Sequence, residues 1–179
     1  EAVERAFVVV SEKNSGLDEP ERRNIARVVG LGSIKYADLS NNRQSDYVFD
    51  WEKMLALQGN TAPYLQYAYT RIRSIFRKGE TTDFSTAKIA LSAPEELALA
   101  KHLMNFGQVL ELVAADHRPN FLCNFLFELA GHFSSFYEAC PVLKTEAAEK
   151  ESRLALCELT ARVMRQGLDA LGIEVTEVM

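Results

Sequence analysis

Residues 59–78 read Gly-Asn-Thr-Ala-Pro-Tyr-Leu-Gln-Tyr-Ala-Tyr-Thr-Arg-Ile-Arg-Ser-Ile-Phe-Arg-Lys and predict a helix with two unlike faces. Thr61 suits the N-cap, and Pro63 falls in the first turn, where a missing N–H costs nothing. At about 100° per residue, one apolar arc is formed by Leu65, Ala68, Tyr69, Ile72, Ile75 and Phe76. We expect this arc to be buried and the rest of the chain to pack around it.

A different arc of the same helix carries Tyr64, Tyr67, Arg71 and Lys78. Two tyrosines and an arginine on neighbouring turns offer flat π faces and a fixed cation, the groups with which proteins bind unstacked bases of RNA loops. Spacing alone favours a simpler interpretation, a half-buried helix with tyrosines at the edge of a core. Both interpretations stay open at this point.

Composition limits the possible classes of protein. The chain has 179 residues, 47% of them hydrophobic, which is enough for one core plus an appended segment. Its net charge of −5 gives little general attraction to phosphates, so any RNA contact must come from a local patch or from stacking. The three cysteines form no CxxC pair, which argues against a zinc site or a disulfide framework and favours free thiols in the core of a cytosolic protein.

No apolar run approaches the length of a membrane helix, and the sequence has no signal peptide. The other amphipathic stretches predict long helices joined by short loops, at 1–13, 18–38, 94–115, 120–139 and 145–170. This pattern predicts an all-α, antiparallel helical bundle. We expect the most apolar helix, 120–139, to lie at the centre of the bundle.

Local signals set the expected ends of these elements. The N-cap residues are predicted to be Asp18, Asp50, Ser92 and Thr145, and Gly172 is predicted to end the last helix before a tail, 173–179. We expect an extended piece at 47–49 and a loop at 78–83. Gly30 and Gly32, placed inside a helix, predict tight packing against a neighbour.

The sequence holds no self-contained active site. It has no Walker-type phosphate loop and no GxSxG, HExxH or GxGxxG motif. His102 lies within an apolar stripe and is interpreted as a core or edge histidine, and spacing assigns no partner to His117 or His132. The chain is therefore not expected to perform chemistry on its own.

A resemblance to a known protein family reduces the number of possible functions. Asp46-Tyr-Val-Phe-Asp-Trp-Glu-Lys-Met54, the run from Gly59 to Ser74, Val29-Gly-Leu-Gly-Ser-Ile-Lys-Tyr-Ala-Asp-Leu-Ser40 and the ending Gly167 to Met179 resemble the C-terminal half of arginyl-tRNA synthetases, which are class I enzymes. The resemblance runs along essentially the whole chain. It implies connecting helices that follow a catalytic domain at 1–58 and an α-helical anticodon-binding domain at 59–179.

The class I His-Ile-Gly-His-like and Lys-Met-Ser-Lys-Ser-like motifs are both missing from the chain. Because the chain begins without methionine and within a predicted helix, we expect it to be a fragment whose missing part lies upstream. The resemblance implies that the full-length enzyme attaches arginine to its tRNA in the cytoplasm, using ATP and Mg²⁺. The expected partners are tRNA(Arg) and the upstream catalytic domain, with no cofactor in this fragment and no membrane or DNA partner.

The resemblance also implies which residues bind tRNA. The turn 59–63 matches a loop that orders against the anticodon loop. On the helix after it, Tyr64, Tyr67 and Arg71 match positions that face tRNA and the neighbouring catalytic domain. Tyr137 matches an aromatic that helps form a pocket for an unstacked anticodon base, and Met179 matches a methionine that lines the same pocket. The predicted tRNA-binding residues are Gly59, Asn60, Thr61, Ala62, Tyr64, Tyr67, Arg71, Tyr137 and Met179. The ending departs from the family near Thr176, where a proline is frequent.

A function from another class remains as the alternative. A helical bundle can act as a protein–protein interaction module, with its tyrosines as anchors of the interface. The run from Gly59 to Ser74 argues against this alternative, because a generic scaffold does not require that particular sequence.

We expect the chain by itself to form no arginyl-adenylate, because neither class I signature motif is present. The measurement is arginine-dependent exchange of pyrophosphate into ATP, with the full-length protein as the positive control. Exchange above background by residues 1–179 alone would contradict this expectation.

Overall fold

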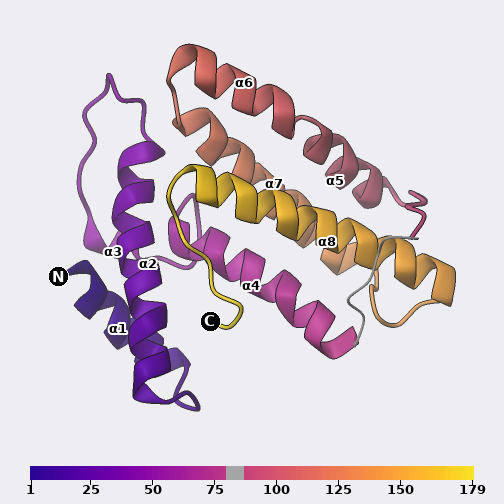
Figure 1. The fold of residues 1–179 in the computed structure, drawn as a ribbon, viewed down its shortest axis with the longest axis horizontal. Helices are drawn as coiled ribbons and strands as arrows, with labels where there is room; N and C mark the ends of the chain where they lie inside the picture. The colour runs from indigo at the N-terminus through magenta and orange to yellow at the C-terminus, as the bar shows by residue number, and fades with distance from the viewer. Residues whose placement is uncertain (80–86) are drawn as a thin grey trace.

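The computed structural model describes residues 1–79 and 87–179 (Figure 1). These residues form the helices α1 (Ala2–Lys13), α2 (Glu19–Leu39), α3 (Trp51–Met54), α4 (Ala62–Gly79), α5 (Pro94–Met104), α6 (Phe106–Asp116), α7 (Asn120–Ala139) and α8 (Ala147–Ala170). No strand occurs within the described ranges. The predicted all-α bundle is confirmed.

The long helices α4, α7 and α8 pack together, and α5 and α6 lie along α7 (Figure 1). The α1–α2 hairpin stands across one end of this bundle, with α2 in contact with α4 and α7. Phe133 and Phe136 of α7 are among the largest fully buried side chains, which confirms the central place of this helix. All six residues of the apolar arc of α4 are buried in the same cluster.

The α1–α2 hairpin has a small core of its own, formed by Ala6, Val10, Ile25, Ala26 and Val29. A Cβ added to Gly30 would lie 2.8 Å from the Cα atom of Val3, and one added to Gly32 would lie 2.8 Å from Nε2 of Gln66. Gly30 therefore lets α1 pack closely against α2, and Gly32 lets α4 pack closely against α2. The tight packing predicted for these two residues is confirmed.

The predicted cap at Asp18 is confirmed, because its carboxylate accepts a hydrogen bond from the backbone N–H of Glu21, while the Glu21 side chain accepts one from the N–H of Asp18. Asp50 likewise caps α3. The prediction for Ser92 is wrong: α5 begins after Ala93, and Ser92 donates its hydroxyl proton to Glu96. The prediction for Thr145 is also wrong, since α8 begins after Glu146 and the Thr145 hydroxyl donates to Glu149.

The helix predicted at 94–115 is two helices. The series of helical backbone hydrogen bonds is interrupted at Asn105. The N–H of Asn105 donates to the carbonyl of His102, three residues earlier, at 3.1 Å. Asparagine is a poor residue for a helix interior, and α6 buries no side chain fully, so packing does not enforce a continuous helix there.

Two further expectations concern the connecting segments. Residues 47–49 form no regular element, and Val48 is 90% exposed. The loop predicted at 78–83 begins too early, because α4 extends through Gly79. Residues 80–83 of that prediction lie outside the described residues.

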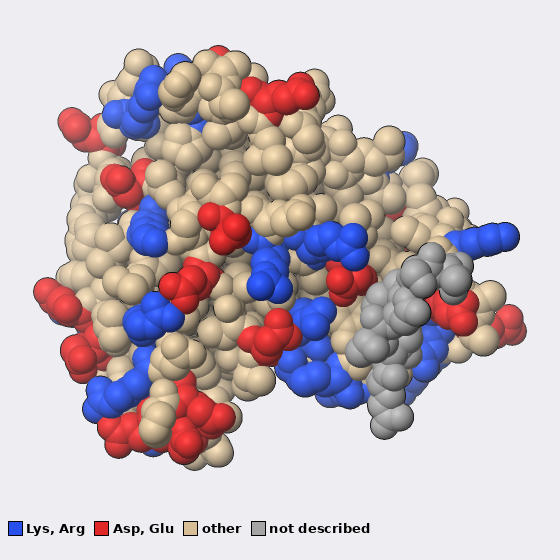
Figure 2. Space-filling view, in the orientation of Figure 1, with Lys and Arg blue, Asp and Glu red and all other residues tan. Residues whose placement is uncertain are grey.

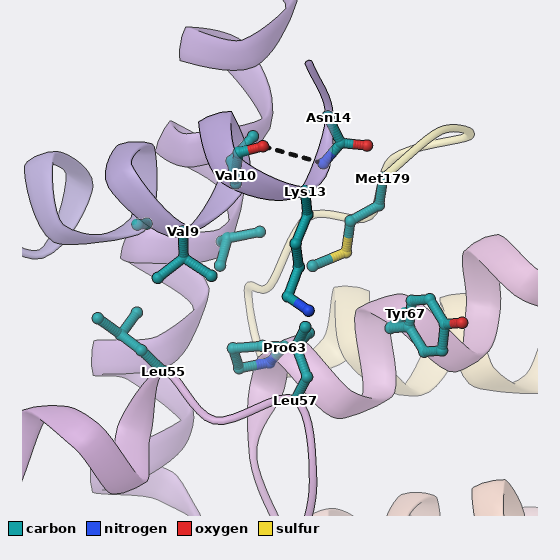
Figure 3. Close-up of a pocket in the computed structure, with 11 residues that line it drawn as sticks. Val9, Val10, Lys13, Asn14, Leu55, Leu57, Pro63, Tyr67 and Met179 are labelled. Atoms are coloured by element: carbon teal, nitrogen blue, oxygen red, sulfur yellow. Dashed lines mark hydrogen bonds between the residues drawn. The ribbon is translucent and has the colours of Figure 1, made fainter. Parts of the chain in front are cut away.

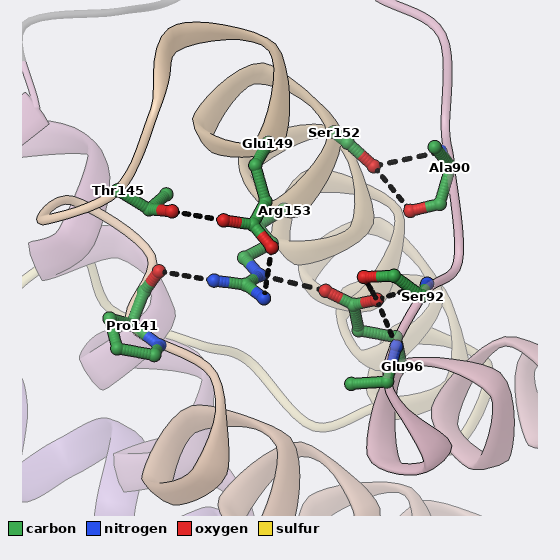
Figure 4. A network of polar contacts seen from close by, with 9 residues as sticks. Ala90, Ser92, Glu96, Pro141, Thr145, Glu149, Ser152 and Arg153 are labelled. Atoms are coloured by element: carbon green, nitrogen blue, oxygen red, sulfur yellow. Dashed lines mark hydrogen bonds and ion pairs between the residues drawn. The ribbon is translucent and has the colours of Figure 1, made fainter.

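A buried ion pair joins α5 to α8 (Figure 4). Nε of Arg153 donates to Oε1 of Glu96 at 2.7 Å, and the two side chains are only 8% and 2% exposed. Arg153 also donates to the carbonyl of Pro141 and to Glu149. Burial alone would raise the pKa of Glu96, but the hydrogen bonds from Ala93, Arg153 and Ser92 outweigh it and lower that pKa below its ordinary value of 4.5.

We expect Glu96→Gln to lower the free energy of unfolding by about 3 kcal/mol at pH 7, because it leaves Arg153 without a partner that is as deeply buried. Since the folded-state pKa of Glu96 is lowered, its stabilisation is complete above pH 4.5 and is lost as the pH falls through the folded-state value. The difference between variant and wild type in urea unfolding should therefore shrink in acid. Glu151→Gln, an exposed change on α8, is the control, and a pH-independent difference for Glu96→Gln would contradict the assignment.

Candidate RNA-binding surface

The turn before α4 is held in place from two sides. Gly59 has a φ of 78°, in the left-handed region that favours glycine. The Tyr36 hydroxyl on α2 lies 2.5 Å from Oδ1 of Asn60 and 2.9 Å from the carbonyl of Cys123 on α7, so this one group links α2, the turn and α7. Burial raises the pKa of Tyr36 far above its ordinary value, which keeps the hydroxyl protonated as a donor.

Thr61 and Ala62 begin the helix. The Thr61 hydroxyl donates to the carbonyl of Ala56 at 2.7 Å and accepts from the N–H of Tyr64 at 3.3 Å, which confirms the predicted N-cap. Ala62 is completely buried, so its side chain has no surface to offer a ligand. Among the predicted turn residues, Gly59 and Asn60 are the exposed ones.

The outer face of α4 meets α7. Tyr67 is 44% exposed, and Tyr64 packs edge to face against Phe127 with ring centroids 5.7 Å apart. The Arg71 guanidinium lies 4.9 Å from the centre of the Tyr137 ring, within the range of a cation–π contact. The structure therefore brings Tyr137 beside the tyrosine and arginine face of α4.

The tail after α8 is fixed mainly by polar contacts. Gly172, with a φ of 67°, ends the helix as predicted. From α4, Gln66 donates to the carbonyl of Glu174 at 2.8 Å and Thr70 donates to the carbonyl of Thr176 at 3.0 Å. Of the three apolar side chains in the tail, Ile173 is buried, Val175 is partly buried against the main core, and Val178 is 46% exposed. Two of these apolar side chains therefore anchor the tail, together with the hydrogen bonds that its backbone carbonyls accept from side chains of α4.

Glu177 is the main ionic anchor of the tail. Its carboxylate accepts from Nε of Arg73 at 2.9 Å and from the Tyr69 hydroxyl at 3.0 Å. Burial alone would raise the pKa of Glu177, but these two hydrogen bonds lower it. Burial, together with the bond to Glu177, raises the pKa of Tyr69.

Met179 lies in a pocket of about 490 Å³ between α1, α2 and α4 (Figure 3). Eleven residues line it, namely Ala6, Val9, Val10, Lys13, Asn14, Val29, Leu55, Leu57, Pro63, Tyr67 and Met179. Tyr137 is not among them. Within the described residues, Met179 and Tyr67 thus lie on one flank of the outer face of α4, and Arg71 and Tyr137 lie on the other.

Positive charge gathers near the C-terminal half of α4 (Figure 2). Arg77 and Lys78 fall in its last turn, and Arg71 lies one turn or more before them. Arg73 is already paired with Glu158 and Glu177, so it contributes less net charge. This is the local patch that an acidic chain needs in order to approach phosphates.

Sequence patterns missed the contribution of α1 and of the chain between α3 and α4 to this surface. The pocket beside Met179 is also lined by residues that are far from Met179 in the sequence, namely Val9, Lys13, Leu55 and Leu57. No motif or spacing marks them, because they meet only when the α1–α2 hairpin docks on α4.

In the described part of the chain, the histidines and cysteines form no cluster that could hold a metal ion. Nε2 of His102 lies 2.9 Å from the carbonyl of Phe125, and its ring stacks on the Phe125 ring, as expected for a histidine at the edge of a core. All three cysteines are free and buried, and burial raises the pKa of Cys123 to about 12. No helix in the described ranges is long and apolar enough to cross a membrane.

Comparison with known proteins identifies the class. Residues 65–179 match the DALR anticodon binding domain, and residues 1–51 match the catalytic domain of class I (R) tRNA synthetases. The chain therefore belongs to the DALR anticodon-binding domain family. Along its whole length it is 54% identical to the arginine–tRNA ligase of Mannheimia succiniciproducens and, over 179 residues, 52% identical to that of Chromobacterium violaceum.

Solved structures agree with the sequence matches. The arginyl-tRNA synthetase of Thermus thermophilus superposes with a TM-score of 0.92 at 32% identity, covering 99% of this chain and 31% of that one. The Plasmodium falciparum enzyme gives 0.88 at 28% identity, covering 99% of this chain and 32% of that one. The chain spans 31% of the length of the two ligases above.

These matches confirm the family resemblance and support tRNA recognition rather than the protein–protein module. The division between residues 58 and 59 stays a prediction, since it falls between the two family matches.

We expect Glu177→Gln to loosen the tail, because it weakens the bonds from Arg73 and Tyr69. Hydrogen exchange of the amides at 174–179 should become about fivefold faster at pH 7, as a partly exposed, charge-assisted bond contributes about 1 kcal/mol. Glu138→Gln, an exposed change on α7, should leave exchange of the tail unaltered. Unchanged exchange in Glu177→Gln would mean that the backbone contacts from α4 alone hold the tail.

Proposed function

We propose that this chain is the tRNA-recognising C-terminal part of an arginine–tRNA ligase and that it binds the anticodon loop of tRNA(Arg). The observation that carries the proposal is the outer face of α4, where Tyr67 and Arg71 stand between Met179 on one flank and Tyr137 on the other. The anticodon-binding family match over residues 65–179 supports the same conclusion.

This surface suits bases that have left the stack of an RNA loop. The exposed ring of Tyr67 offers a stacking face, and Arg71, held over Tyr137, offers a planar cation. Stacking of a base on an aromatic side chain contributes about 1–3 kcal/mol and needs no net positive charge. A chain with a net charge of −5 can therefore bind RNA through stacking plus the few cations of α4.

The scaffold fixes this surface before RNA arrives. Tyr36 holds the turn at Asn60, and Glu177 ties the tail to Tyr69 and Arg73. Because these groups are already ordered, less conformational entropy is lost on binding.

Arginine activation itself belongs to the part of the relatives that this chain does not span. The full-length protein would use ATP and Mg²⁺, with the domain upstream of residue 1 as the catalytic partner, in the cytoplasm. No residue of this chain is assigned to catalysis and no cofactor is assigned to it. Its role is to hold tRNA in register with the catalytic domain.

The test is binding of transcribed tRNA(Arg) by the full-length protein, beside the same tRNA with an altered anticodon. We expect the altered anticodon to weaken binding, and Tyr137→Ala to weaken binding of tRNA(Arg) about tenfold, in line with the loss of one stacking contact. Phe121→Ala is the matched control, because it removes another partly exposed ring of α7 that lies under an arginine, Arg118, 5.8 Å from the ring centre. Equal binding of both tRNAs would contradict the proposal.

A further inference from the structure

Two histidines lie side by side where α5 packs on α7. The rings of His102 on α5 and His132 on α7 have centroids 4.8 Å apart, with an angle of 42° between their planes. We infer that this pair makes the packing of α5 and α6 on α7 depend on pH, because two protonated rings at this distance repel each other across the interface. The inference goes beyond the proposed function, since it concerns how the bundle itself responds to protons.

The position of His102 on α7 is well defined. Its ring stacks on Phe125 with centroids 4.4 Å apart and an interplanar angle of 11°, and its Nε2 lies 2.9 Å from the carbonyl oxygen of Phe125. Because a carbonyl only accepts, we assign the proton of the neutral ring to Nε2. An added proton then goes to Nδ1, which lies 4.0 Å from Oε2 of Glu128.

One added proton is tolerated, but a second is not. Glu128, one turn before His132 on α7, can pair with a protonated His102, although its side chain is 64% exposed and the pair is therefore weak. A proton on His132 as well would set two positive rings beside that single carboxylate. Burial and the neighbouring His102 lower the pKa of His132 below its ordinary value of 6.5, and Glu128 opposes this without cancelling it.

The other charges near this interface are too exposed or too remote to replace Glu128. On α5, Lys101 is exposed. The carboxylates of α6, at 111 and 116, are also exposed. Contact of α5 with α8 includes the ion pair between Glu96 and Arg153, which lies more than one turn before His102. The charges that act on His132 are thus those of His102 and Glu128.

The segment formed by α5 and α6 is suited to open without the rest of the bundle. It lies along α7 at the outside of the fold (Figure 1), and α6 buries no side chain fully. Regions with few buried apolar contacts open before the whole protein unfolds. Since the folded-state pKa of His132 is lowered, its contribution to packing is complete above pH 6.5 and is lost as the pH falls through the folded-state value.

The experiment is hydrogen exchange of the full-length protein without tRNA, between about pH 7.5 and pH 5, with each rate divided by the intrinsic rate at that pH. We expect the amides at 99–116 to open about tenfold more often at the acidic end, the effect of a difference of one unit in the pKa of one group. Amides in the middle of α8, at 154–164, should change by no more than about twofold. Glu96 stays ionised over this range, because its pKa is below 4.5.

Two variants test the pair itself. His132→Phe keeps a flat ring but takes up no proton, so the acid-induced opening should largely disappear. Glu128→Gln keeps the size of an exposed side chain but removes the compensating charge, so opening should begin at a higher pH. His117→Asn is the control, because it removes the third histidine of the chain, which is exposed, and asparagine tolerates the φ of 56° found there.

The inference is overturned if the wild type shows no acid-induced opening at 99–116, or if His132→Phe keeps the wild-type response. If His132→Phe does not fold, the Glu128→Gln variant decides: a midpoint at higher pH supports the inference and an unchanged midpoint defeats it. Loss of the response in His117→Asn would assign it to the wrong histidine and also defeat the inference. These measurements involve no RNA, so their failure leaves the proposed function untouched.

Discussion

Burial of one side of α4 is the constraint on which the rest of the structure depends. Leu65, Ile72 and Ile75 are essentially inaccessible, packed with the cores of α7 and α8. Because a helix is rigid, burying this arc places the arc with Tyr67 and Arg71 at the surface. Hydrophobic burial thus orients the side chains of the candidate RNA-binding surface, although it contributes no specificity of its own.

Buried polar groups then determine which segments of the chain pack around α4. The Gln66 amide donates to the carbonyls of Val28 and Glu174, so a single side chain of α4 holds both α2 and the tail. Tyr36 acts similarly for the turn and α7. Hydrogen bonds are directional, and leaving a buried donor unpaired is costly, so these contacts permit few alternative arrangements of the hairpin and the tail.

The charge distribution explains how an acidic chain can form part of an RNA-binding protein. Several acidic groups near the surface are already neutralised within the fold, as Glu177 is by Arg73 and Glu174 is by Arg27. Among the described residues, the ion pairs of α4 are made by Arg73, and Arg77 and Lys78 in its last turn form none. Local potential, rather than net charge, therefore determines where a phosphate or a base edge can approach.

The amino-acid sequence determined the helices, the apolar arc of α4, the central place of α7 and the caps at Asp18 and Asp50, because helical period and capping depend on neighbours within a few residues. It did not locate the break at Asn105. It also did not locate the true start of α5, near which Glu96 accepts a hydrogen bond from Arg153 on another helix. Only the tertiary structure decided that Arg71 lies over Tyr137 and that Lys13, Tyr67 and Met179 share one pocket. Those neighbours come from separate segments, and no local pattern records how the α1–α2 hairpin docks on the bundle.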